Sequence, residues 1–326
     1  MSEPDVSSPL PEAPPTSRDS GDRRGMKILK GPSGLRAGWR LLVFAAILTA
    51  LFSAGMAVSR LSHHHRSQSA RIAFTPEVVL IGEASSFALV LLASWIMARF
   101  ERRKVAAYGL PLHRALRREF WRGAAIGFAG ISLLLAAMRA AGVFQVESLA
   151  LHGGAILRYA ILWGIVFLFV GLFEEFGFRG YALFTLTTGM GFWPAALASS
   201  ALFGYVHHGN PGETWLGACN AGFVGLLFCL TLRCTGDLWL AVGFHAAWDW
   251  GESYFYGVPD SGELAAGHLL NVSFSGPRWL SGGTVGPEGS WLCTLLLVVL
   301  WLIFLVWLGD ARYPHADAIG PPGGEN

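Results

Sequence analysis

Two carboxylates and a guanidinium interrupt an apolar stretch near the middle of the chain. Glu174, Glu175 and Arg179 follow the apolar run 161–170 with no turn signal between them, so they fall on a segment with the character of a membrane helix. An ionisable group inside hydrocarbon costs roughly 2.5–3.5 kcal/mol even on a lenient insertion scale. Groups kept at that cost mark function by default, and these three are therefore candidates for chemistry.

Helix geometry separates the roles of these three side chains. Glu175 and Arg179 are four residues apart, which places them on one helix face with the acid on the N-terminal side, the favourable order for an ion pair. Glu174 lies about 100° around the helix from Glu175 and faces elsewhere. The spacing predicts that Glu175 is held by Arg179 and that Glu174 is available.

Two later apolar segments each carry a histidine. His207 closes the segment 192–208, and His245 lies four residues before Asp249 on the segment 237–256. A carboxylate one turn away can hold an imidazole in one tautomer. Each histidine alone is as readily explained as a packed or helix-end residue. Ionisable groups on three separate apolar segments are harder to explain by packing, because buried charge must be paired or used.

One carboxylate and two imidazoles suit the activation of water, by either of two routes. In the first, Glu174, His207 and His245 hold Zn²⁺, whose bound water ionises near neutral pH. In the second, Glu174 takes a proton from a water that His207 also holds, while His245 and Asp249 stabilise the developing oxyanion. We favour the metal-free route. A serine or cysteine nucleophile fits less well, since these segments contain no Gly-x-Ser-x-Gly type of turn.

The composition defines the elements that must position these groups. Of 326 residues, 53% are hydrophobic and 14% are charged, whereas a soluble domain usually carries about 25% charged residues. We therefore expect an all-α, polytopic membrane bundle. At about 20 apolar residues per crossing, the chain predicts about eight spans: 40–59, 78–98, 123–143, 156–183, 192–208, 214–233, 237–256 and 290–309.

The distribution of Lys and Arg predicts the orientation and the domain limits. Basic residues gather in the N-terminal tail and between spans two and three, whereas most later loops hold almost none. We expect both termini to be cytoplasmic. The predicted parts are a disordered tail over 1–37, a bundle over 38–310 with the site-bearing core at about 105–256, and a C-terminal tail over 311–326.

The order of the spans raises a geometric problem. If spans 156–183 and 192–208 are antiparallel and both cross fully, Glu174 and His207 lie towards opposite ends of their helices. Either the earlier span continues deep and breaks near Gly177 or Gly180, or the later one is tilted or begins partway in.

Several other polar residues lie in apolar segments. Glu83 and Asn220 are expected first to make hydrogen bonds between helices. Trp248, Trp250 and Tyr254 fit an aromatic belt at the membrane surface, with Glu252 in the same interface. The histidine triplet 63–65 is more often a solvated run than a metal site. The basic segment 105–122 resembles a helix lying on an anionic leaflet, and a plain connector explains it equally well.

Three short motifs together carry a family resemblance. They are Glu174-Glu175-x-x-x-Arg179-Gly180, Phe203-x-x-x-His207 and His245-x-x-x-Asp249. In this order, each on an apolar span, they resemble the signature of the CPBP family, which includes eukaryotic CAAX prenyl proteases of the Rce1 type and bacterial relatives linked to bacteriocin processing and self-immunity (Abi). The resemblance covers about residues 105–256.

The resemblance implies a multi-pass intramembrane endopeptidase of the CAAX type in the bacterial inner membrane. Its substrate would be a membrane-associated peptide or a prenylated protein, its surroundings are lipid, and no nucleic acid is involved. By matching motif positions, Glu174, His207 and His245 are the essential residues, whereas Glu175 and Arg179 are supportive. Some relatives are described as metalloproteases, although this chain has no His-Glu-x-x-His helix.

One departure from the family and two other classes of protein stay open. The family often has Asn where this chain has Asp249, and an ionised Asp cannot donate a hydrogen bond to an oxyanion. Asp249 therefore orients His245, supports a metal, or is itself protonated. The alternative function is a non-catalytic immunity or proton-coupled transport protein that uses the same Glu/His cluster. A haem protein with two axial histidines would leave the Glu pair unexplained.

Overall fold

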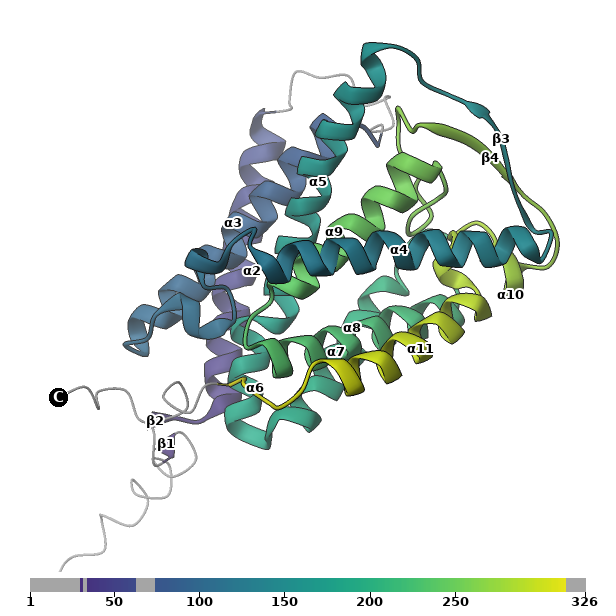
Figure 1. The fold of residues 1–326 in the computed structure, drawn as a ribbon. Helices are drawn as coiled ribbons and strands as arrows, with labels where there is room; N and C mark the ends of the chain where they lie inside the picture. The colour runs from purple at the N-terminus through teal and green to yellow at the C-terminus, as the bar shows by residue number, and fades with distance from the viewer. Residues whose placement is uncertain (1–29, 32–33, 63–73, 315–326) are drawn as a thin grey trace, which may run out of the picture.

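The computed structural model describes residues 30–31, 34–62 and 74–314, which form a helical bundle (Figure 1). The predicted histidine triplet and most of both predicted tails lie outside these residues. The main helices are α2 (Ala37–Ser62), α3 (Pro76–Phe100), α4 (Arg118–Ala140), α5 (Gly154–Arg179), α6 (Tyr181–Met190), α7 (Phe192–His207), α8 (Trp215–Thr235), α9 (Trp239–Asp249) and α11 (Trp291–Trp307). A short α10 (Arg278–Ser281) precedes α11, and a π-helical turn η4 (Trp250–Tyr256) follows α9.

Helices occupy all eight segments that hydropathy predicted. Within the described residues, five apolar segments are long enough to cross a membrane, namely Ala37–Val58, Pro76–Phe100, Arg118–Ala140, Gly154–Met190 and Trp215–Thr235. The helices α7, α9 and α11 are shorter, at 16, 11 and 17 residues. The predicted all-α membrane bundle is confirmed.

The helix is interrupted at Gly180, and the chain reverses its direction at Gly191. This path explains how Glu174 and His207 can lie at the same level although they are on successive spans. The helix α5 ends at Arg179, and α6 follows directly. Gly191 then adopts a φ of 82°, a conformation that side chains rarely adopt, and starts α7. The outward path from Glu174 to Met190 spans 16 residues and the return from Phe192 to His207 spans 15. Nearly equal helical paths bring His207 back to the level of Glu174.

Glycines set the close approach of α4 to α9, the helix that carries His245. A Cβ at Gly123 or Gly127 would overlap the backbone of α9, and one at Gly243 would overlap the backbone of α4 at Phe120. Small residues at a membrane-helix interface let two backbones approach in this way. Figure 1 shows α4 running across the front of α9.

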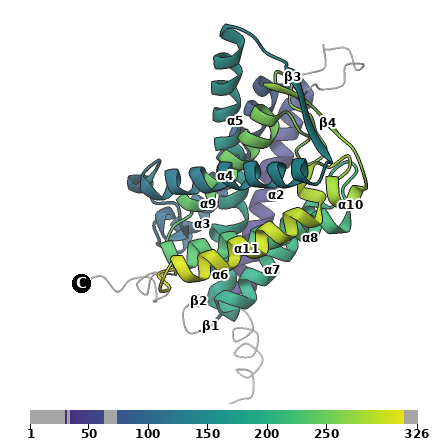
Figure 2. The same cartoon turned by 45° about the vertical axis from the view of Figure 1, so that its right-hand side comes forward.

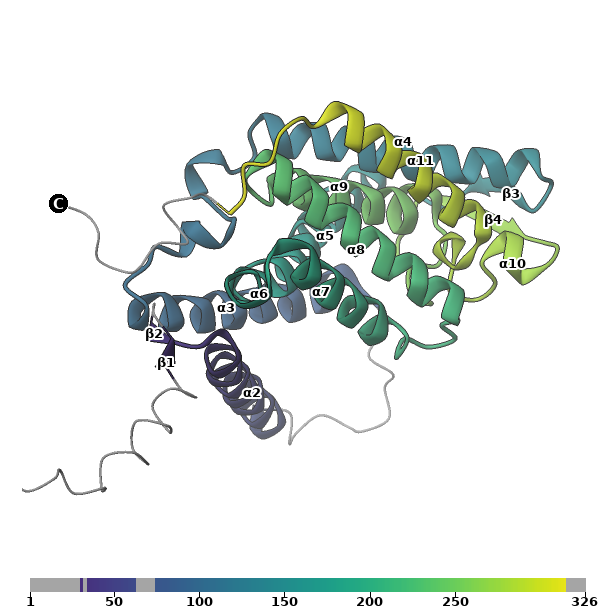
Figure 3. The ribbon, with the colours of Figure 1, turned by 90° about the horizontal axis from the view of Figure 1, so that it is seen from below.

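Two strands join loops that are far apart in the sequence. The strands β3 (Phe144–Leu149) and β4 (Leu270–Phe274) pair antiparallel, with Phe144 opposite Phe274 and a bulge between Val146 and Ser148 (Figure 2). Alternation was too short to predict either strand. A second two-stranded ribbon, β1 (Lys30–Gly31) with β2 (Gly34–Leu35), precedes α2. Seen from below, α8 lies between α7 and α11 (Figure 3).

The predicted aromatic belt is wrong. Trp248 and Tyr254 are buried, at 5% and 1% exposure, and Glu252 is fully buried. The reason is that Trp248 lies where α9 packs against α4, α5 and α8, whereas Glu252 and Tyr254 lie in η4, which packs against α4, α5 and β4. The Tyr254 hydroxyl donates to the carbonyl of Ile156 at 2.7 Å, which satisfies within the protein the polar end that a belt residue would present to headgroups.

The basic segment 105–122 is a connector and not one interfacial helix. It consists of two single turns, η2 (Val105–Tyr108) and η3 (Leu112–Arg114), followed by the first turn of α4. Pro111 caps the second turn with extended backbone, which prevents one continuous helix across the segment.

Candidate active site

The predicted residues meet in one cavity of about 370 Å³ between α3, α5, α7, α8 and α9. Glu174, His207, His245 and Asp249 line it. Its other walls are largely apolar, from Phe74, Val79, Phe167, Val170, Phe203, Val206, Val224, Phe228, Phe244 and Leu297. Apolar walls of this kind lower the local dielectric constant and strengthen electrostatic interactions between the groups inside.

Glu174 lies between the two histidines. Its Oε2 is 3.7 Å from Nε2 of His207 and also 3.7 Å from Nε2 of His245. This oxygen is buried and has no hydrogen-bond partner among the described residues. The three side chains come from α5, α7 and α9. A water molecule bound to this oxygen would lie near both imidazole nitrogens.

The backbone fixes the orientation of His207. Its Nδ1 lies 2.9 Å from the carbonyl oxygen of Phe203, one turn earlier in α7. A carbonyl can only accept, so Nδ1 carries the proton and donates. In the neutral ring the lone pair is therefore on Nε2, the nitrogen that faces Glu174.

Glu175 holds His245, which was one of the three roles that the sequence left open for Asp249. The Oε1 of Glu175 accepts from Nδ1 of His245 at 2.9 Å and from Nη1 of Arg179 at 3.2 Å. Asp249 instead lies on the other side of the ring, with Oδ2 3.5 Å from Nε2 of His245. The i,i+4 spacing predicted the contact of Asp249 with the ring correctly, but it could not tell which nitrogen would be contacted.

Arg179 connects the Glu175 pair to the other histidine. The predicted Glu175–Arg179 ion pair is confirmed, and both side chains are fully buried. The guanidinium lies 4.2 Å from the ring centroid of Phe203, the residue whose carbonyl orients His207. A cation over an aromatic face is favourable, more so when it is desolvated. One buried ion pair thus braces both imidazoles.

Asn220 and Glu83 behave differently from each other. Asn220 donates to the carbonyls of Glu288 and Ser290 and accepts from the Thr294 hydroxyl, so the predicted interhelical bonding is confirmed. Glu83 lines the cavity, and its buried Oε2 has no hydrogen-bond partner among the described residues. The interhelical hydrogen bond predicted for Glu83 is not present among the residues that the structure describes.

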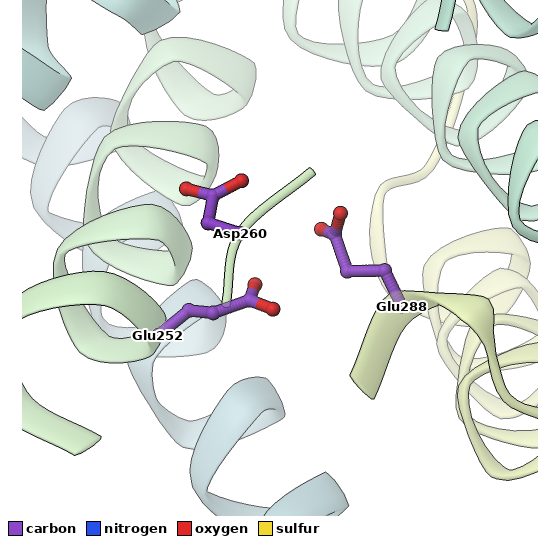
Figure 4. Close-up of side chains that lie close together, drawn as sticks. All are labelled: Glu252, Asp260 and Glu288. Carbon is purple, nitrogen blue, oxygen red and sulfur yellow. The ribbon is translucent and has the colours of Figure 1, made fainter. Parts of the chain in front are cut away.

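A group of three carboxylates beside the cavity was not predicted. Glu252, Asp260 and Glu288 offer ligand atoms that all lie within 4.8 Å of one another (Figure 4). The indole Nε1 of Trp248 donates to Glu252 at 2.8 Å and to Glu288 at 3.0 Å. Asp260 and Glu288 also line the cavity. In the sequence, Asp260 and Glu288 are distinguished only by lying in a loop with few charged residues.

The crowding of acids changes their ionisation. Burial, followed by the charge of Asp260, raises the pKa of Glu288 to about 8. Burial also raises the pKa of Asp260, while the hydrogen bond from Ser253 lowers it in part. At neutral pH the group therefore retains protons, which reduces the repulsion between its members.

The donor types suit both routes of water activation, but their spacing favours the metal-free one. Two imidazoles that are fixed through Nδ1 present Nε2 to one carboxylate, and zinc accepts these donor types. Among the described residues, however, these three are not a group whose ligand atoms all lie within 4.8 Å of one another. The same Nε2 and carboxylate atoms can hold one water molecule instead.

A bundle of membrane-length apolar helices with a Glu/His cavity between them defines a polytopic membrane protein with ionisable groups gathered inside it. Residues 156–251 match the family model of the type II CAAX prenyl endopeptidase Rce1-like proteins. This segment contains all six predicted site residues, so the family resemblance is confirmed over it, and it supports a CAAX-type intramembrane protease in general. Searches of curated proteins and of solved structures gave no match to the chain.

Proposed function

We propose that this chain is a CAAX-type intramembrane endopeptidase in which Glu174 and His207 activate a water molecule. The observation that carries the proposal is the position of Glu174, whose Oε2 lies 3.7 Å from an imidazole nitrogen on each of two other helices. General-base geometry requires reach to the proton directly or through one water, and this arrangement meets that condition.

In the proposed reaction, water donates one hydrogen bond to Glu174 and the other to Nε2 of His207. Glu174 takes the proton as the water oxygen bonds to the peptide carbonyl carbon, and the carbonyl π electrons move to its oxygen. When the tetrahedral intermediate collapses, the C–N bond breaks and Glu174 returns the proton to the departing amine. Proton transfer by one positioned group contributes about 10²–10⁴-fold in rate.

His245 and Asp249 are proposed to stabilise the oxyanion. His245 donates through Nδ1 to Glu175, and in its doubly protonated form it donates through Nε2 to the developing charge. Its positive charge is balanced by the carboxylates around it, Glu174 and Glu175. Asp249, which is 6% exposed, is proposed to act as a neutral acid and to supply the second donor that Asn supplies in relatives.

The cavity walls indicate the class of substrate. Apolar side chains surround the polar groups, so the cavity favours a peptide that reaches it from the membrane or carries an apolar modification. The family implies a peptide or a prenylated protein. We propose a multi-pass location in the bacterial inner membrane with the N-terminus cytoplasmic.

The test is cleavage of a panel of peptides, prenylated and unmodified, by the purified chain in proteoliposomes. Glu174→Gln and His207→Gln should each lower kcat by about 10²–10⁴-fold without changing thermal stability. Glu263→Gln is the matched control, because Glu263 lines the cavity but has no part in the reaction. Full activity in Glu174→Gln would disprove the mechanism. Proton flux without cleavage, abolished by Glu174→Gln, would favour the transport alternative.

A separate measurement decides between the two routes. Elemental analysis of the purified chain, with a chelator test of turnover, should show activity that does not depend on zinc. Stoichiometric zinc needed for turnover would replace the metal-free route and would make Glu174, His207 and His245 the proposed ligands.

A further inference from the structure

A second pocket, of about 450 Å³, lies away from the Glu/His cavity and is lined by arginines. Five arginines line it, namely Arg114, Arg117, Arg118, Arg122 and Arg312. Only two carboxylates, Glu119 and Asp237, line the same pocket. The lining therefore carries a formal excess of three positive charges. We call this pocket the arginine pocket.

Both carboxylates are already paired. Arg114 Nη1 lies 3.0 Å from Oδ2 of the buried Asp237, and Arg122 Nη1 lies 3.0 Å from Oε1 of Glu119. Arg122 is also placed over the ring of Trp307, at 5.5 Å from its centroid. These contacts hold two of the five guanidinium groups in place and neutralise both carboxylates of the pocket.

The other three arginines stay available for an anion. Within the described part of the chain, Arg117, Arg118 and Arg312 have no carboxylate within 4.0 Å. Arg117 and Arg118 stand at the start of α4, a helix of 23 residues, and Arg312 comes from the segment after α11. The first-turn N–H groups of a helix have no partner within it and add to the attraction for an anion.

The surroundings indicate where the anion comes from. The helix α4 is one of the membrane-length apolar segments and begins at Arg118, so the pocket lies at the end of a span. Trp307, at 46% exposure, lines the pocket, and the exposed side chains of Leu116 and Trp121, at 48% and 63%, adjoin lining residues in the sequence. A ligand with a charged head and an apolar body fits this setting better than a soluble ion does.

We propose that the arginine pocket binds the phosphate diester of an anionic phospholipid headgroup, with the acyl chains along Leu116, Trp121 and Trp307. Guanidinium groups match phosphate oxygens by paired, charge-assisted hydrogen bonds. This site is independent of the proposed peptidase reaction, since none of its residues lines the Glu/His cavity.

The test is binding of short-chain lipids to the full-length chain in detergent, measured by native mass spectrometry and by the thermal midpoint. Dioctanoyl phosphatidylglycerol should bind about tenfold more tightly than dioctanoyl phosphatidylcholine, with the difference reduced by salt. The variant Arg117→Gln/Arg118→Gln/Arg312→Gln should lose this preference. Arg312→Gln alone, which lies outside the helices, should weaken binding roughly three- to fivefold.

The control is Arg139→Gln, an exposed arginine in the last turn of the same helix α4. It makes the same change of charge and should keep the full preference for phosphatidylglycerol. An equal preference in the triple variant and in the control would overturn the proposal. Equal stabilisation by inorganic phosphate alone would overturn the assignment to a lipid, since the site would then take a soluble anion.

Discussion

The Glu/His cavity and the arginine pocket hold their charges in different ways. In the cavity, Glu175 and Arg179 are fully buried, and one carboxylate oxygen receives bonds from two other side chains. In the arginine pocket, Arg117, Arg118 and Arg312 are exposed and unpaired among the described residues. The first arrangement fixes geometry, as catalysis requires, whereas the second attracts a charge without fixing one geometry.

This difference predicts unequal costs for similar substitutions. Removing one partner of a buried ion pair leaves an uncompensated charge and costs roughly 3–5 kcal/mol. Removing an exposed, unpaired charge changes stability by less than about 0.5 kcal/mol. The following predictions test the contrast, from the largest expected effect to the smallest.

The largest effect is expected at Asp249. If this residue donates to the oxyanion as a neutral acid, Asp249→Asn keeps the donor and should retain activity within about threefold. Asp249→Leu removes the donor and should lower kcat by about 10²–10³-fold. The measurement is kcat and KM of both variants on one peptide. An equal loss in both variants would show that Asp249 acts as an anion.

The second prediction concerns Glu175, which positions His245 without contacting the reacting atoms. Glu175→Gln should lower kcat about 10–100-fold with KM little changed, because the imidazole loses its charged partner. It should also lower the free energy of unfolding, since Arg179 is left buried and unpaired. Arg139→Gln, at an exposed arginine outside both pockets, measured in parallel, should change neither quantity. A similar loss of stability in the two variants would remove the contrast between buried and exposed charges.

The third prediction concerns Gly225 in α8, which leaves room for Arg179. A Cβ at this position would overlap the guanidinium Nη2, so Gly225→Ala should shift Arg179 off Phe203. Overpacking of this kind costs about 1–3 kcal/mol, and we expect about a tenfold loss of activity. Gly177→Ala in α5 is the control, because a Cβ there meets no atom within 4 Å. Equal behaviour of the two variants would show that Arg179 is not held tightly.

The smallest effect is expected at the carboxylate group. The pKa of Glu288 is about 8 in the folded chain against an ordinary value of 4.5, so the folded state binds more protons between these two values. Stability should therefore fall as the pH rises from about 4.5 to about 8. Glu288→Gln should flatten this slope and raise Tm at pH 9, because the variant has no charge to bury there. If the stability of Glu288→Gln depended on pH in the same way as that of Glu263→Gln, the raised pKa of Glu288 would be contradicted.

Local spacing predicted part of the site correctly. The four-residue spacing of Glu175 and Arg179 was enough to predict their ion pair, and hydropathy predicted eight apolar segments, all of which contain helix. Charges on three apolar segments were enough to infer that Glu174, His207 and His245 converge, because isolated buried charge is costly.

The particular hydrogen bonds and loop contacts between distant segments could not be predicted. Glu175 bonds His245 across 70 residues, and no spacing rule reaches that far. The carboxylate group depends on Asp260 and Glu288, which only the folding of a loop brings to Glu252. Arg312 joins the arginine pocket from the end of the bundle for the same reason.

The turn-back through α6 has a consequence for insertions and deletions. Because His207 reaches Glu174 only after nearly equal outward and return paths, one residue removed from α6 would displace α7 by about 1.5 Å and rotate it by about 100°. Side-chain identity within α6 can vary as long as packing is kept, whereas its residue count cannot. Any homologue that retains this chemistry is thereby expected to show no length variation between Gly180 and His207.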